Sequence, residues 1–263
     1  VNPNEKLPIL QEGVSIGSLS SPKAVFPALI DLFDTIGVCF LYGCAENKRE
    51  FNNCLERIAW RMALSLPIDL CELLVYNGGK PGENFVSLNR LPKSFFKSSQ
   101  PVLFDVDSEE FTKKLSAVYR ELAIRQSAII ASDKNGISEM NVSEVADARL
   151  KYTFLFVSDF PHVTEEQRKL ISKIVSAGCH NLGVFVFVSW DMNAKLDDKI
   201  DYQSFLNEMT LLFPKNDRYF FKNSGHDELL NKFMLCLDGQ TVKKEESDPW
   251  LSTINNRIEK ASS

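Results

Sequence analysis

The chain alternates short runs of apolar residues with longer stretches in which apolar residues recur every three or four positions. The runs at 35–42, 70–76, 152–157 and 182–189 are rich in β-branched and aromatic residues, which predicts strands. The run at 152–157 (YTFLFV) is almost continuously apolar, as is typical of a strand buried on both faces of a parallel sheet. A shorter strand is predicted at 101–104.

The stretches between these runs predict helices. Apolar residues over 51–62 have helical spacing. A capping signature of Asp107 with Glu110 starts a helix that runs to about Ala131, and Thr164 with Gln167 starts another that ends near Gly178. Strands alternating with helices of this length predict a three-layer α/β domain with a mainly parallel central sheet. Ligand sites in such domains lie at the carboxyl ends of the strands.

The pattern becomes shorter after Trp190. It predicts a helix at 202–209, an apolar segment at 211–213, an edge strand at 219–221 and a helix from Asp227. The stretch 240–263 is charged and Ser-rich apart from Trp250 and Ile254. We therefore divide the chain into a domain at 1–239 and a tail or docking arm at 240–263. Trp250 and Ile254 would anchor that arm either in a partner's groove or back on this domain.

Composition narrows the class of protein. A chain of 263 residues, 44% hydrophobic and 25% charged, excludes disordered and low-complexity classes. Its net charge of −5 argues against a chain-wide surface for polyanions. The six cysteines stand singly, without CxxC pairs, so we expect reduced thiols and a cytoplasmic protein. No stretch approaches the ~20 apolar residues of a membrane span, and the start of the chain, without Met or signal peptide, suggests a piece of a larger protein.

A predicted strand that runs into Gly43 and then a helix is the context of a phosphate-binding loop. Backbone N–H groups and the helix N-terminus cradle the anion there. The chemistry also needs the pattern G-x-x-x-x-G-K-[ST]. Residues 43–50 instead read G-C-A-E-N-K-R-E.

The order of the segments resembles the motor domain of FtsK/SpoIIIE-type DNA translocases and the related ATPase modules of type VII secretion. Five stretches over roughly residues 10–225 carry the resemblance. Residues 14–17 (VSIG) are similar to the P-[IV]-G start of the domain, 121–126 (ELAIRQ) to E-M-x-x-R-Y, and 137–141 (ISEMN) to N-I-x-x-Y-N. Residues 154–160 stand at the place of the Walker B strand, and 176–190 are similar to the G-R-A-x-G-I-H-L strand. The loop 77–82 resembles the family's D-P-K-G turn with the Asp lost. The resemblance implies a RecA-like P-loop NTPase fold.

The nucleotide motifs of that family are altered. If Gly43 matches the first Gly of Walker A, then Lys48, Arg49 and Glu50 stand where the family has Gly, Lys and Ser/Thr. A side chain at the Gly position obstructs the phosphate nest. Glu50 would replace the hydroxyl that binds Mg²⁺ and would place a negative charge facing a triphosphate.

The Walker B and sensor segments also depart from the family's nucleotide-binding pattern. The family has an Asp-Glu pair after the Walker B strand, where one carboxylate organises Mg²⁺ and the other activates water. This chain has Ser158-Asp159-Phe160, with a single carboxylate, and its sensor strand ends Ser189-Trp190-Asp191. We therefore expect a vestigial nucleotide site made of Gly43, Lys48, Arg49 and Asp159, with no catalytic residues, no metal ligands and no bound cofactor. ATP with Mg²⁺ is disfavoured.

Each of these residues also has an ordinary structural interpretation. An Asp directly after a buried strand serves in a turn or caps a helix. Lys48 and Arg49, beside Glu46 and Glu50, fit a solvated charged turn. The three histidines, His162, His180 and His226, lack the spacing of metal ligands.

Three hypotheses follow. The first is a catalytically degenerate ATPase domain of a larger protein, with a structural or regulatory role in DNA translocation, defence or secretion. Its partners would be other ATPase domains or subunits, and DNA would be reached through the assembly. The second is an active, unorthodox ATPase in which Lys48 or Arg49 contacts phosphate and Asp159 holds Mg²⁺. The third is an unrelated α/β interaction domain. It would be favoured by a sheet in which the strands from Thr35 and Tyr152 do not lie side by side.

Overall fold

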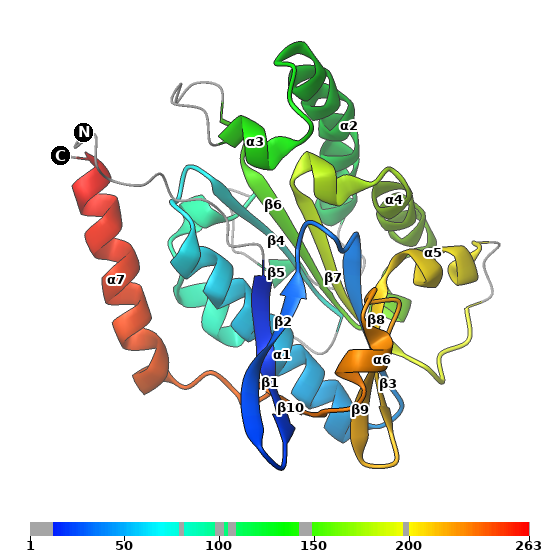
Figure 1. Cartoon of the computed structure of the whole chain (residues 1–263). Coiled ribbons are helices and arrows are strands. Elements are labelled where there is room, and N and C mark those ends of the chain that lie inside the picture. Colours follow the sequence, from blue (N-terminus) through cyan, green and yellow to red (C-terminus); the bar gives the residue numbers. More distant parts are fainter. Residues whose placement is uncertain are drawn as a thin grey trace.

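The structure is a computed structural model, and it describes residues 13–78, 82–97, 103–104, 109–141, 149–196 and 200–262. The predicted cap Asp107 and residues 79–81 of the glycine-rich loop lie outside these ranges. A central sheet with helices on both of its faces forms the body of the molecule (Figure 1).

The central sheet has seven strands, of which six are parallel. Their order is β5 (Leu103–Phe104), β4 (Cys71–Asn77), β6 (Tyr152–Ser158), β7 (Val184–Asp191), β3 (Gly37–Tyr42), β8 (Thr210–Lys215) and β9 (Arg218–Lys222). β9 runs antiparallel to β8 and forms the edge. This arrangement confirms the predicted three-layer α/β class and the edge strand near 219–221.

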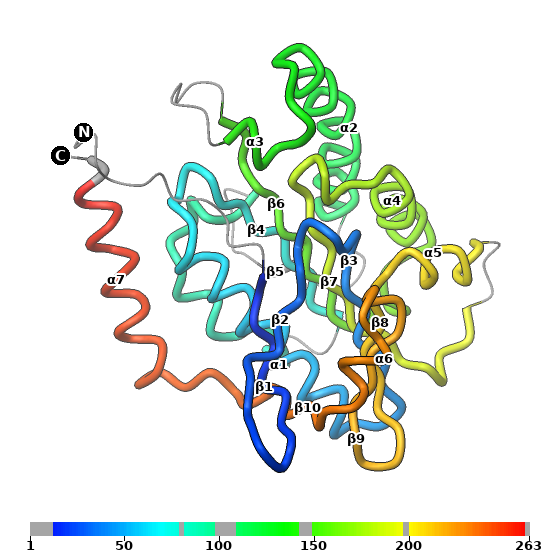
Figure 2. The backbone as a smooth tube through the Cα atoms, in the orientation of Figure 1, coloured from blue at the N-terminus to red at the C-terminus, as the bar shows by residue number. Residues whose placement is uncertain are grey.

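Helix α1 (Ala45–Ser65) covers one face of this sheet, and α2 (Glu109–Ala131) and α4 (Glu165–Ser176) cover the other (Figures 1 and 2). Thr164 and Gln167 form the predicted capping box at the start of α4. Shorter helices are α3 (Ile137–Asn141), α5 (Tyr202–Glu208) and α6 (Asp227–Leu230). The 3₁₀ turns are η1 (Val86–Arg90), η2 (Lys93–Phe95), η4 (Phe160–His162) and η5 (Cys179–Leu182).

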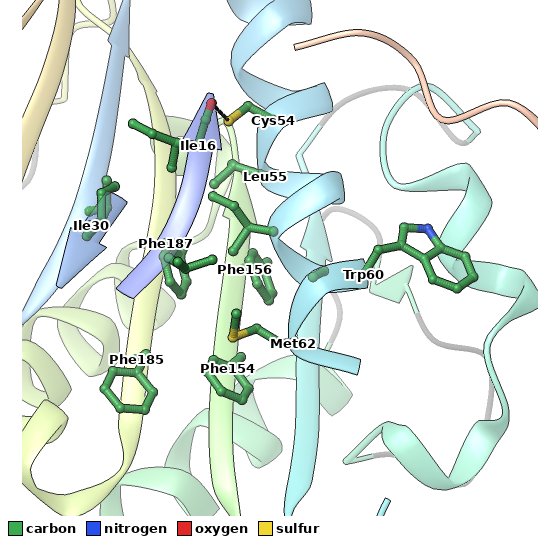
Figure 3. Packing of buried hydrophobic residues seen from close by; sticks show 14 of the residues in the cluster. Ile16, Ile30, Cys54, Leu55, Trp60, Met62, Phe154, Phe156, Phe185 and Phe187 are labelled. Atoms are coloured by element: carbon green, nitrogen blue, oxygen red, sulfur yellow. Dashed lines mark hydrogen bonds between the residues drawn. The ribbon is translucent and has the colours of Figure 1, made fainter. Parts of the chain in front are cut away.

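Strand β6 shows why two separate layers of core form. Alternate side chains of a strand point to opposite faces of the sheet. Phe154 and Phe156 therefore pack on the α1 side, where Phe156 stacks on Phe187 with ring centroids 5.0 Å apart. Figure 3 shows these rings beside Leu55 and Met62 of α1. The intervening residues of β6 face α2 and α4, so every position of the strand is buried, as its sequence predicts.

The two strands named as a test of the third hypothesis are not neighbours. β7 lies between β3 and β6 and is parallel to both. The expectation of direct pairing is therefore wrong, because the chain places the later strand β7 in the middle of the sheet. All three strands nevertheless end at the same edge, so residues that follow β3 and β6 can still meet across β7.

A second, antiparallel sheet was not predicted. It consists of β10 (Met234–Leu237), β1 (Gly13–Ser21) and β2 (Ala24–Asp31). Ile16 and Ile30 turn inward toward α1 and join the main core (Figure 3). β1 pairs with β10, more than 200 positions later in the chain, and no local pattern reveals such a pairing.

The segment after residue 239 forms helix α7 (Lys244–Ser262) and folds back on this domain. Trp250 packs on Trp60 of α1 with ring centroids 5.4 Å apart, and Ile254 is buried in the main core. Arg57 of α1 donates two hydrogen bonds to the Glu246 carboxylate at the start of α7. Of the two placements considered for Trp250 and Ile254, the structure has the one on this domain; the division at residue 239 remains a prediction.

In the described part of the chain, the helices are too short or too polar to cross a membrane.

Candidate functional site

The connection between β3 and α1 consists of Gly43 and Cys44 alone. β3 ends at Tyr42 and α1 begins at Ala45, and the first helical hydrogen bond runs from the Lys48 amide to the Cys44 carbonyl. A phosphate-binding loop needs several non-helical residues whose N–H groups converge on the anion. Residues 45–50 are helical here, so the connection from β3 to α1 does not form such a loop. The alternative interpretation of Lys48 and Arg49 as a charged turn is also wrong, since both lie in the helix.

The start of α1 sends its charged side chains in different directions, because successive helical residues are about 100° apart around the axis. Lys48 reaches toward the end of β6, where its Nζ lies 2.6 Å from Oδ2 of Asp159. Glu50 turns toward β9 and accepts a hydrogen bond from the Tyr219 hydroxyl. It also packs on Gly239, where an added Cβ would come within 2.2 Å of Glu50 Cγ. Glu50 therefore does not face the position that the motif alignment assigned to a triphosphate, and Arg49 is exposed.

Asp159 is the centre of the site. It follows β6 directly, is only 1% exposed, and has a left-handed backbone with φ 57°. Its Oδ1 accepts a hydrogen bond of 2.5 Å from the Tyr42 hydroxyl, and His162 Nδ1 lies 2.9 Å from its Oδ2. The side chain makes no helix-cap hydrogen bond. Its side chain therefore accepts hydrogen bonds from Tyr42 and Lys48 with His162 alongside. Its backbone has the place of the structural interpretation, since Asp159 is the N-cap residue of η4 and its carbonyl accepts from the His162 amide.

The phenol of Tyr42 stays a neutral donor in this cluster. Burial raises the pKa of Tyr42, and the hydrogen bond to the Asp159 carboxylate raises it further. Lys48 also lies over the Tyr42 ring, with Nζ 5.9 Å from the ring centroid. The ammonium group therefore has two stabilising contacts within the protein.

A chain of buried hydrogen bonds continues from Asp159 beneath α1. The Asp159 amide donates to Ser189 Oγ at 2.8 Å, and this hydroxyl donates to Asn52 Oδ1 at 2.7 Å. Asn52 donates in turn to Asn84 Oδ1 at 3.0 Å, and Asn84 donates to Asn77 Oδ1 at 2.9 Å. The network thus joins the ends of β4, β6 and β7 to α1.

Sequence reasoning missed this network, although a signal was present. Asn77, Ser158 and Ser189 are each the first polar residue at the end of an apolar strand run. In a parallel sheet such residues meet at one edge. The Gly78 amide donates to Ser158 Oγ at 2.8 Å, and a Cβ at Gly78 would come within 2.2 Å of the Ser158 carbonyl oxygen. Close packing against β6 therefore requires a glycine at this position.

The charges of this cluster are paired within the protein. Asp159 accepts hydrogen bonds from Tyr42 and Lys48, and His162 Nδ1 lies 2.9 Å from its Oδ2. The two-residue connection between β3 and α1 is too short to form a phosphate nest of converging amides. Among the described residues, no group of three His, Cys, Asp or Glu side chains is placed to hold a metal ion.

The remaining predicted motifs have structural roles. Arg125, from the 121–126 motif, is buried and donates to the Leu182 carbonyl at 3.0 Å and to Thr153 Oγ1 at 2.9 Å. Trp190 stacks on Phe160 with centroids 4.9 Å apart. His180 is partly buried, and this burial lowers its pKa. None of these side chains belongs to the Asp159 cluster.

Comparison with known proteins gives similarity in structure alone. No protein-family model matches the chain, and no curated protein matches its sequence. Among solved structures, EssC (ATPases 2 and 3) from Geobacillus thermodenitrificans aligns over 96% of this chain and 50% of its own, with TM-score 0.67 and 12% identity. EccC (ATPases 2 and 3) from Thermomonospora curvata, in complex with a signal sequence peptide, aligns over 98% and 49%, with TM-score 0.63 and 15% identity.

The pCW3 conjugation coupling protein TcpA, solved with ATPγS, aligns over 98% of this chain and 73% of its own, with TM-score 0.57 and 14% identity. This chain therefore spans about half the length of the EssC and EccC structures. The similarity over nearly the whole chain confirms the resemblance stated from the sequence, at the level of fold. The chain has a RecA-like fold, which it shares with the ATPase domains of EssC and EccC and with the coupling protein TcpA.

Proposed function

We propose that this chain is a non-catalytic module with an ATPase fold, which serves a structural or regulatory role in a larger assembly. The observation that supports the proposal is the ion pair of Lys48 with the buried Asp159, at the edge where an ATPase of this fold holds nucleotide. The two charges best suited to bind phosphate and Mg²⁺ neutralise each other.

The free energy of opening this pair favours the proposal. Lys48 is 24% exposed and Asp159 is 1% exposed, so binding of a phosphate by Lys48 would leave the carboxylate buried without its cation. Breaking a fully buried pair costs about 3–5 kcal/mol, and the partial exposure of Lys48 reduces our expectation to about 2 kcal/mol. Since each 1.4 kcal/mol is a factor of ten, affinity would fall by roughly thirtyfold.

The kind of assembly is inferred from the structural neighbours. EssC and EccC carry more than one ATPase domain in a chain, and TcpA is a conjugation coupling protein. We infer that this module sits beside other ATPase domains or subunits in a secretion, DNA-translocation or defence system, on the cytoplasmic side. DNA would be contacted through the assembly.

ATP hydrolysis by the purified chain tests this proposal. We expect no turnover above a matched preparation of Asp159→Ala, with or without Mg²⁺. Turnover that disappears in Asp159→Ala would refute the non-catalytic role. A preparation of Lys113→Ala serves as a surface control, since Lys113 is exposed on α2 and lies outside the candidate site.

The active ATPase is the second candidate. The proximity of Lys48 to Asp159 at the carboxyl edge of the sheet is the observation in its favour, with Arg49 exposed nearby. If phosphate displaced Asp159 from Lys48, then Lys48→Ala would abolish hydrolysis and Arg49→Ala would reduce it. The strand order meets the condition that would favour the third candidate, an unrelated α/β domain, since β7 separates β3 from β6. The fold match to EssC over 96% of the chain argues against that candidate.

A further inference from the structure

Strand β2 of the small antiparallel sheet presents a row of apolar side chains to solvent. Ala28 and Ile30 are buried on the side of α1, where Figure 3 shows Ile30. Because neighbouring residues of a strand point to opposite faces, Val25, Pro27 and Leu29 project from the other face of the sheet. Val25 is 68% exposed and Leu29 is 53% exposed. This row is therefore available to a partner.

The neighbouring strands complete this face, which we call the outer face. The register places Ser18 of β1 beside Pro27 and Ser20 beside Val25. On β10, Met234 pairs with Ser20 and is 56% exposed. The outer face thus consists of exposed apolar residues on β2 and β10, with small serine side chains between them. Contiguous exposed apolar side chains of this kind mark a contact surface.

Pro27 directs a partner to the face of the sheet and away from its edge. β2 is the last strand of the sheet, and such an edge can accept a strand from another chain. Proline has no backbone N–H, and within a sheet it stands where its nitrogen faces the free edge. A strand added beside β2 would therefore lack a hydrogen bond at the centre of the contact. The side chains of the outer face have no such obstacle.

The charges along β2 indicate what the partner is. Lys23 is exposed just before the strand, and Asp31 is exposed at its last position. Each lies four residues from Pro27, and Val25 and Leu29 each lie two residues from it. At about 3.3 Å per residue, Lys23 and Asp31 are up to about 13 Å from Pro27, on opposite sides. The row therefore has an apolar centre with opposite charges at equal spacing on either side.

We propose that two copies of this chain stack through their outer faces, with the two β2 strands antiparallel about a two-fold axis at Pro27. The same surface then serves on both copies. Lys23 of each copy lies opposite Asp31 of the other, and Val25 lies opposite Leu29. Stacking with the strands parallel would set Lys23 against Lys23 and Asp31 against Asp31. Juxtaposed like charges are costly at an interface, so the charges select the antiparallel dimer.

Sedimentation equilibrium of the whole chain over a concentration series tests the dimer. We expect the mass to rise from one chain to two as concentration increases. Lys23→Asp and Asp31→Lys should each weaken association by about tenfold, because the two-fold axis repeats each charge contact. The double variant that carries both changes should restore the native association constant, since the charges are again complementary. A monomer at every concentration, or a double variant no better than the single ones, would overturn the proposal.

Two further variants separate the charge contact from other effects. Asp31 Oδ1 accepts a hydrogen bond from the Phe33 amide at 2.9 Å, so Asp31→Lys also disturbs the turn after β2. Asp31→Asn retains an acceptor there and removes only the charge, and it should weaken association less than Asp31→Lys does. Lys113→Asp, at an exposed position of α2, matches the change in net charge and should leave association unchanged. Equal weakening by Lys113→Asp and Lys23→Asp would overturn the proposal.

The apolar part of the contact has its own test. Leu29→Asp should abolish the dimer, whereas Ile124→Asp, at a 67% exposed position of α2, should leave it intact. Circular dichroism checks that both variants are folded, and a reducing agent prevents a disulfide through Cys236, which is exposed on the outer face. Equal association of the two variants would overturn the proposal. These residues lie outside the Asp159 cluster, so this result is independent of the test of the proposed function.

Discussion

Lys48 Nζ lies 2.6 Å from Oδ2 of Asp159, although the two residues are 111 positions apart in the sequence. The lysine is in the first turns of α1, and the aspartate follows β6 in a left-handed conformation. β7 separates their parent strands, so the contact spans the switch in strand order at the carboxyl edge of the sheet. The carboxyl edge of the sheet, where ligand sites of such α/β domains lie, therefore holds a contact within the protein.

Replacing Lys48 by Met should destabilise the protein, because Asp159 would stay buried without its cation. The loss for a fully buried pair is about 3–5 kcal/mol, and the partial exposure of Lys48 reduces our expectation to about 2 kcal/mol. Urea unfolding followed by circular dichroism measures it. Arg49→Met is the control and should change the free energy of unfolding by less than about 0.5 kcal/mol. Equal effects of the two variants would show that the ion pair does not stabilise the fold.

The buried amide network predicts a large effect for Asn52→Ala. This change removes the acceptor for the Ser189 hydroxyl and the donor to Asn84, and leaves both partners unsatisfied under α1. A buried polar group without a partner costs about 1–3 kcal/mol. Asn53→Ala, at a partly exposed neighbour that donates to the Gly239 carbonyl, should cost clearly less. The free energies of unfolding of the two variants, measured side by side, test this prediction. Equal losses in Asn52→Ala and Asn53→Ala would contradict it.

The attachment of α7 should weaken in acid. The hydrogen bonds from Arg57 hold the pKa of Glu246 below its ordinary value. A carboxyl group whose folded pKa is depressed stabilises the fold above the pKa of the unfolded chain, and that contribution is lost as pH falls through the folded pKa. Glu246→Gln should therefore be less stable than the native chain at pH 7, by less than about 1 kcal/mol because Glu246 is 36% exposed.

The same variant should approach the stability of the native chain as pH falls through the depressed folded pKa of Glu246, because below that pKa the carboxyl group is protonated in both states. Urea unfolding of the two chains at several pH values measures the difference. A difference that stays constant from pH 7 to pH 3 would contradict the role assigned to Arg57. Glu245→Gln, one residue away, is the control, and its effect should be small at both ends of that range.

Local patterns in the sequence predicted the strands of the central sheet and most helices, because each apolar run or capping box lies within a few residues. YTFLFV reads as a buried strand wherever it stands in the sheet. The order of the strands is set by the packing of the whole chain, and the expected pairing of β3 with β6 was wrong for that reason. The sheet of β1, β2 and β10 depends on partners at opposite ends of the sequence and was missed.

The candidate site, too, could be predicted from the sequence only in part. Lys48 and Asp159 were chosen from the sequence by their places after two strands, and the structure brings them together with Tyr42 and His162. The prediction that the Glu50 side chain faces a triphosphate was wrong. The motif alignment assumed a loop at residues where the helix has already begun, and Glu50 instead accepts a hydrogen bond from Tyr219. The Asn and Ser network could be recognised only once the strand ends were placed at one edge.

Calorimetric titration of the chain with ATP and ADP, with and without Mg²⁺, tests the central claim most directly. The Lys48–Asp159 pair and the two-residue connection before α1 predict no heat of binding at millimolar nucleotide. Micromolar binding that depends on Mg²⁺, and that is lost in Lys48→Ala, would contradict the account and would make the nucleotide-driven motor the leading hypothesis.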